Sequence, residues 1–95
     1  LDVAPPEPPY QADEIYDALQ QGDKLVRLGG LRVLRIGEEV FVNGEKLDSP
    51  HRPALDAIAS HLVLTADTFG DALEDPSFLA MLSALVNSGY WFFED

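Results

Sequence analysis

The chain has 95 residues, of which 46% are hydrophobic, and it contains no cysteine. This length and composition suit a single folded domain and exclude a disordered chain, a disulfide scaffold and a thiolate metal site. No apolar run is long enough to cross a bilayer, and no segment resembles a secretory signal, so we expect no membrane partner. The lack of cysteine permits an intracellular setting, and our prediction is a cytoplasmic protein. The chain begins at Leu1 rather than Met, and we expect it to be part of a longer protein.

The formal net charge is −11, and it is unevenly distributed along the chain. Residues 1–23 contain six acids and no base, and residues 53–95 contain seven acids and no base. All six bases lie in residues 24–52 with four acids, which gives this segment a net charge of +2. A protein this acidic repels nucleic acid at long range, and only a patch in the middle segment could oppose that repulsion.

Residues 1–10 read LDVAPPEPPY and contain four prolines, which favour an extended segment without regular structure. We interpret them as a lead-in that links residues 11–95, the folded domain, to an upstream domain. Two alternatives are a proline-rich ligand for a recognition domain and a segment that lies along the domain surface. A helix is predicted next, in QADEIYDALQQG, because its apolar residues share one face and Gly22 supplies a stop: Ala12, Ile15, Tyr16 and Leu19.

Four short segments rich in Val, Leu and Ile follow: KLVRL, LRVLRI, EVFVN and EKLD. Turn residues separate them, and Asn43-Gly44 is the clearest turn because both residues tolerate positive φ in a two-residue hairpin. We therefore predict one antiparallel meander across residues 24–48. Arg32 and Arg35 fall on opposite faces of their strand because side chains alternate.

Three helices and a strand complete the chain. Pro53 suits the start of the first of these helices, Thr65 is a predicted N-cap of a short second helix, and Asp75 with Pro76 opens the third, which ends at Gly89. The predicted inward residues are Ala54, Leu55, Ile58, Ala59 and Leu62, then Phe69, Ala72 and Leu73, then Phe78, Leu79, Leu82, Leu85 and Val86. The last segment, YWFFE, predicts a strand that pairs with the meander and is at least partly covered on both faces.

This order predicts an α+β, winged-helix-like fold, in which a small antiparallel sheet packs with three to four helices. In DNA-binding proteins of this kind the third helix carries side chains that read base edges. Here residues 76–88 contain no Lys, Arg, Gln or His, and Asp71, Glu74 and Asp75 crowd the start of the helix. We therefore predict that this helix belongs to the core and has no DNA partner. The four aromatics at 90–93 alternate between faces, so they are predicted to pack rather than stack bases.

Four cations of the predicted meander, Lys24, Arg27, Arg32 and Arg35, form our candidate partner surface. The alternatives are that they pair with nearby acids on a solvated face or contact RNA directly. No catalytic, cofactor-binding or metal-binding residue is predicted. His51 and His61 would need a third ligand such as Asp48 or Asp56, and no His-x-Asp pair is present. Ser60-His61 lacks an accompanying oxyanion hole, and Gly29-Gly30 lacks the spacing of a phosphate loop.

Several long segments carry a resemblance to a known family: APPEPPYQADEIYDAL, LVRLGGLRVLRIG, NGEKLDSPHRPALDAIAS and FGDALEDPSFLAMLSALVNSGYWFFE. They closely resemble the C-terminal region of the bacterial ribosomal oxygenases, which are enzymes of the cupin or JmjC type. The resemblance implies a parent enzyme that uses Fe(II) and 2-oxoglutarate to hydroxylate an arginine of a large-subunit ribosomal protein. It also implies an N-terminal catalytic barrel, a helical dimerisation region and a C-terminal winged helix that is acidic and not expected to bind DNA.

On this resemblance the chain is the non-catalytic winged-helix domain of a homodimeric hydroxylase. Its expected partners are the upstream catalytic and dimerisation domains, with the ribosomal protein as substrate of the parent. The iron ligands and the 2-oxoglutarate-binding residues belong to the barrel, and no position of this sequence matches them. Two other functions stay open: a stand-alone winged helix that binds nucleic acid, and a ribosome-associated module that only binds proteins.

Overall fold

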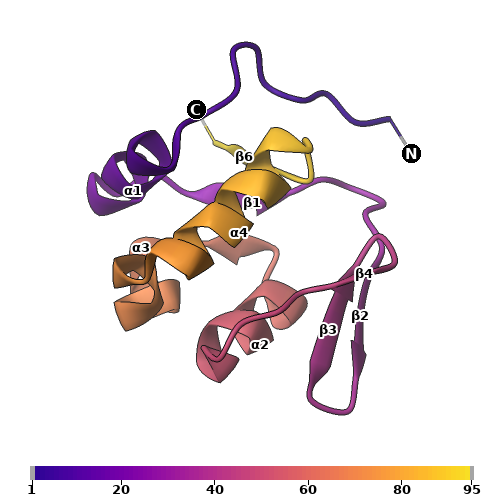
Figure 1. The fold of residues 1–95 in the computed structure, drawn as a ribbon. Coiled ribbons are helices and arrows are strands. Elements are labelled where there is room, and N and C mark those ends of the chain that lie inside the picture. Colours follow the sequence, from indigo (N-terminus) through magenta and orange to yellow (C-terminus); the bar gives the residue numbers. More distant parts are fainter. Residues whose placement is uncertain (1, 95) are drawn as a thin grey trace.

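Helices and two separate antiparallel sheets make up the fold in a computed structural model that describes residues 2–94 (Figure 1). This confirms the predicted α+β class. None of the helices in residues 2–94 is long and apolar enough to span a membrane. In chain order the elements are α1 (Ala12–Gln20), β1 (Leu25–Arg27), β2 (Val33–Ile36), β3 (Glu39–Val42), β4 (Glu45–Lys46), α2 (Arg52–Ser60), β5 (Val63–Leu64), α3 (Ala66–Phe69), the 3-10 helix η1 (Gly70–Glu74), α4 (Pro76–Asn87) and β6 (Trp91–Phe93).

The prediction of a single meander was wrong, because β1 leaves it for a sheet of its own. The strand orders are β5-β1-β6 and β2-β3-β4, and every pairing is antiparallel. A strand has two hydrogen-bonding edges, and both edges of β1 are taken. Arg27 N donates to Leu62 O, and Leu28 N donates to Tyr90 O. β6 therefore pairs with β1 and not with the hairpin, and β5 was missing from the prediction because two residues are too short to show a pattern.

The sheet β2-β3-β4 is a local hairpin structure, which we call the wing. The register runs from Val33 opposite Val42 to Ile36 opposite Glu39, and Val42 then pairs with Glu45 across the turn. The predicted Asn43-Gly44 turn is confirmed: φ is 50° at Asn43 and 87° at Gly44, as a two-residue hairpin of this kind requires. The segment EKLD forms a shorter strand than predicted.

The predicted helix starts and stops are largely confirmed. The Thr65 hydroxyl accepts from Thr68 N, and Asp75 Oδ1 accepts a 2.9 Å bond from Ser77 N. α2 begins one residue before Pro53 and ends at Ser60, after which His61 is extended. Because the chain leaves the helix there, Leu62 is 66% exposed, and its predicted place in the buried stripe was wrong.

The core lies between the helices and the inner face of the β5-β1-β6 sheet. Trp91 is its largest fully buried side chain, and Leu25 and Leu64 are also completely buried. The outer face of this sheet is open: Phe92 is 45% exposed and stands in register with Val26, which in turn faces Val63. The last strand was predicted to be at least partly covered on both faces: Trp91 on the inner face is completely buried, and Phe92 on the outer face is only partly covered.

The lead-in is attached to the domain. Tyr10 N donates to Asn87 Oδ1 at 2.8 Å, and Asn87 Nδ2 donates back to Tyr10 O at 3.0 Å. A Cβ on Gly89 would lie only 3.1 Å from the backbone of Ala4 and Pro5, and the φ of 83° at this position also favours glycine. Residues 4–10 therefore lie along the domain surface, and their further role as a link to an upstream domain stays a prediction.

Candidate interaction surface

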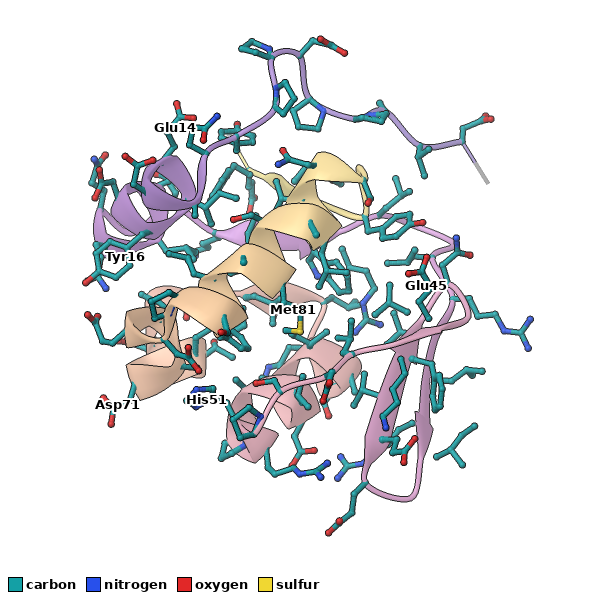
Figure 2. The ribbon with its side chains drawn as sticks, in the orientation of Figure 1. Glu14, Tyr16, Glu45, His51, Asp71 and Met81 are labelled. Atoms are coloured by element: carbon teal, nitrogen blue, oxygen red, sulfur yellow. The ribbon has the colours of Figure 1, made fainter. Side chains whose placement is uncertain are left out.

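The outward side of α4 is lined by small uncharged residues. Ser77, Ala80 and Ala84 are exposed, and Asp71 and Glu74 are exposed beside the helix start. Base reading needs long polar side chains, which this surface lacks, and the acids beside the helix start would repel phosphate. Figure 2 shows Met81 on α4 and Asp71 in the segment before it.

A hollow of about 270 Å³ separates α4 from the wing. Its charged members are Lys46 on one side and Glu45 and Asp48 around it, so acids outnumber the single base. Glu45 is labelled at the wing in Figure 2. A polyanion would meet net repulsion here, and the hollow therefore fits a protein surface better than a nucleic-acid backbone.

Arg27 is enclosed by the fold. Its Nη2 donates to the carbonyl oxygens of Ile58, Ala59 and His61, at 2.6, 3.2 and 3.1 Å, where α2 ends. Its guanidinium also lies over the Trp91 ring, 5.7 Å from the centroid. Burial lowers the pKa of this guanidinium from its ordinary value, but an arginine still carries its proton at neutral pH. Since α2 has no basic residue in its last turn, Arg27 supplies the cation that favours a helix C-terminus.

The other three candidate cations are divided between the two sheets. Arg35 forms an ion pair with Asp56 of α2 at 2.9 Å. Lys24 precedes β1 and Arg32 precedes β2; both are exposed, and neither makes an ion pair with any residue of 2–94. The predicted partner surface, still a prediction, has Lys24, Arg32 and the ion-paired Arg35 as its exposed members, whereas Arg27 is enclosed.

His51 joins the starts of two helices. Its Nε2 lies 2.7 Å from Asp75 Oδ2, and its ring packs edge-on against Phe78 with centroids 5.8 Å apart. The hydrogen bond from His51 and then that from Ser77 N hold the pKa of the Asp75 carboxyl below its ordinary value. Figure 2 shows His51 near the junction of α2 with the α3–η1 segment. Within residues 2–94 no three His, Cys, Asp or Glu side chains gather to hold a metal ion.

Sequence reasoning missed several contacts that join distant segments. Tyr16 of α1 donates to Glu74 Oε2 of η1 at 2.7 Å, and this hydrogen bond raises the pKa of the Tyr16 hydroxyl. The Arg27–Trp91 and His51–Asp75 contacts are of the same kind. Each member has an ordinary local signal, such as a cap or a strand residue, and no pattern in one sequence shows which of them meet.

Comparisons with known proteins place this geometry in a family. The family described as ROXA-like winged helix matches residues 1–92. The chain is 82% identical over 94 residues to the ribosomal protein uL16 3-hydroxylase of Escherichia coli K12. This match covers 99% of the present chain and 25% of the hydroxylase.

Two solved structures of the Escherichia coli ribosomal oxygenase YcfD superpose on it closely. One has 82% identity and a TM-score of 0.96, and covers 99% of this chain and 26% of the other. The second, in complex with cobalt and 2-oxoglutarate, has 81% identity and a TM-score of 0.97 over 100% of this chain and 26% of the other. The chain thus spans about a quarter of the length of these relatives, and it belongs to the ROXA-like winged-helix family.

Proposed function

We propose that this chain is the non-catalytic C-terminal winged-helix domain of an Fe(II)- and 2-oxoglutarate-dependent hydroxylase that modifies an arginine of a large-subunit ribosomal protein. The observation that carries the proposal is the 82% identity to the uL16 3-hydroxylase across nearly the whole chain. A structure of the similar YcfD with cobalt and 2-oxoglutarate supports the cofactor class. On this proposal the parent protein is a cytoplasmic homodimer, and uL16 is its substrate.

The domain itself acts through packing and protein contacts. Residues 2–94 offer no cluster of three metal-binding side chains, and His51 is held by Asp75, which supports placing the Fe(II) site in the catalytic part of the parent. The small uncharged side of α4 and the acidic surroundings of the helix support contact with protein rather than with nucleic acid.

The test uses the complete protein with Fe(II), 2-oxoglutarate and uL16. We expect the intact protein, supplied with O2, to add one oxygen atom to an arginine of uL16, seen by mass spectrometry, while 2-oxoglutarate is converted to succinate and CO2. A matched protein that stops before Leu1 should still hydroxylate a short arginine peptide but show weaker affinity for intact uL16 or lower thermal stability. The proposal fails if the intact protein adds no oxygen to uL16, or if the 95-residue chain alone does so.

A further inference from the structure

One face of the wing has no partner in the domain. Side chains alternate along β2 and β3, so Val40 and Val42 are buried on the side that meets α2, and Arg35 reaches Asp56 of α2. The opposite face, which we call the outer wing face, consists of Arg32, Leu34, Ile36, Phe41 and Asn43. Leu34 and Phe41 stand opposite each other in the register, and Leu34 and Ile36 are 40% and 63% exposed.

The outer wing face has the make-up of a protein contact. Its five residues and Gly44 line a hollow of about 370 Å³ that is open to solvent. The centre is aliphatic and aromatic, Arg32 stands at one end, and the Lys46–Glu39 ion pair, 3.6 Å long, borders the other side. An apolar centre with a polar rim is typical of a surface that another protein segment covers.

The path of the lead-in brings upstream polypeptide to this face. Ala4 and Pro5 pack against Gly89, and Gly89 is followed by Tyr90, whose hydroxyl accepts a 3.0 Å hydrogen bond from Asn43 Nδ2. Asn43 is itself a member of the outer wing face. In Figure 1 the lead-in passes over the α4–β6 turn and continues toward the side where the wing lies.

The lead-in itself lies beside β6. A hollow of about 120 Å³ there is walled by Ala4 and Pro6 of the lead-in together with Trp91 and Phe93. Residues 2–94 place nothing over Ile36 of the outer wing face. Relatives of this chain are much longer, since it covers 25% of the uL16 hydroxylase. The upstream polypeptide joined at the lead-in is therefore long enough to form a body that covers the outer wing face.

We infer that the outer wing face is the docking surface for the upstream part of the same polypeptide, an inference that rests on the proposed place of the domain in a longer protein. Leu34, Ile36 and Phe41 supply the apolar contact, and Arg32 faces an acidic or carbonyl-rich edge of the upstream part. The contact fixes the orientation of the winged helix relative to the rest of its own chain. It does not involve a second copy or a separate protein.

Photocrosslinking in the full-length protein tests the occupant. Benzoylphenylalanine replaces Ile36 in one variant and Leu62 in a matched control, since Leu62 is 66% exposed and lies outside the outer wing face. We expect the Ile36 variant to give a product with the mass of one chain, joined to a peptide upstream of Leu1, and the Leu62 variant to give no such product. Cross-links to an isotope-labelled second copy, or none at Ile36, would overturn the inference.

Limited proteolysis gives a second measurement with Ile36→Asp and Leu62→Asp in the full-length protein. Burial of Ile36 against the upstream part is expected to slow cleavage at the lead-in. Ile36→Asp should therefore accelerate release of the domain about tenfold, and Leu62→Asp should leave the rate unchanged. Equal rates for the two variants would contradict docking at this face. Neither readout needs turnover, so a failed hydroxylation assay and a failed docking surface give different results.

Discussion

The two sheets have three strands each but are assembled in different ways. The wing joins consecutive strands through two-residue turns, and its outer face is open. The β5-β1-β6 sheet places β1, at residues 25–27, between strands at 63–64 and 91–93, and its inner side chains Leu25, Leu64 and Trp91 are completely buried. The strand pairings of the wing are local in sequence, whereas the β5-β1-β6 sheet requires distant segments to close on one core.

Trp91→Ala should produce the largest loss and tests the role of that core. Trp91 is fully buried, and truncation of a buried tryptophan is expected to lower the free energy of unfolding by about 3–5 kcal/mol. Phe92→Ala is the matched control, because Phe92 follows it in the same strand but is 45% exposed. Urea unfolding compares the two; equal losses would show that the core does not depend on the inner face.

Arg27 is the next test, since it links β1 to the end of α2. Arg27→Ala removes a charged donor from three backbone carbonyls and is expected to cost about 1.5–3 kcal/mol of stability. Arg35→Ala removes an exposed ion pair in the wing and should cost at most about 1 kcal/mol. If urea unfolding gave the reverse order, the assignment of Arg27 as a structural residue would be wrong.

Gly44→Ala tests whether the wing is local. Gly44 has φ of 87°, where an L-residue is strained by about 1–2 kcal/mol. We expect faster hydrogen exchange in β3 and β4 with little change in β1. Gly29→Ala is the control, because Gly29 lacks a positive φ and has open space around its Cα. Faster exchange in both sheets would show that the wing and core unfold together.

Asp75 offers a pH test. Its folded pKa lies below the ordinary value, so the carboxylate stabilises the fold above the unfolded pKa of about 4, and this contribution is lost as pH falls through the folded pKa. The difference in unfolding free energy between the protein and Asp75→Asn should therefore be constant above that pH and shrink in more acidic solution. A difference independent of pH would contradict the charged contact with His51.

The last prediction concerns nucleic acid, and here we expect no measurable binding. A net charge of −11 and the uncharged outer side of α4 provide no phosphate contacts to offset repulsion. A titration of labelled DNA and RNA at low salt should show no saturation. Tight binding that weakens as salt rises would favour the alternative of a nucleic-acid-binding winged helix.

Local signals were sufficient to predict the helices and the wing. Asp75 with Pro76 and Thr65 mark helix starts, and Asn43-Gly44 marks a hairpin, because caps and turns depend on residues close in sequence. The same signals could not assign β1, since a short apolar strand fits either sheet. The predicted burial of Leu62 was wrong for a related reason, because the helical spacing of apolar residues continues in the sequence beyond Ser60, where the helix ends.

The candidate surface was only partly predictable. The sequence correctly showed that α4 lacks the Lys and Arg side chains that DNA binding would need, because the absence of a residue type can be read without a structure. Choosing among Lys24, Arg27, Arg32 and Arg35 required the fold, because Arg27 turns inward to carbonyl oxygens supplied by a helix that starts 25 residues later in the chain. The outer wing face could not be identified from the sequence either, because the structure was needed to show that Val40 and Val42 on the opposite face pack toward α2.

The position of β6 has a consequence for protein synthesis. Trp91–Phe93 are translated after every other element, and until they emerge one edge of β1 stays unpaired and the centre of the core lacks its indole. A nascent chain that has already formed its helices therefore keeps apolar surface exposed until β6 has been synthesised and pairs with β1. A product that lacked the codons for Trp91–Phe93 could not complete this core.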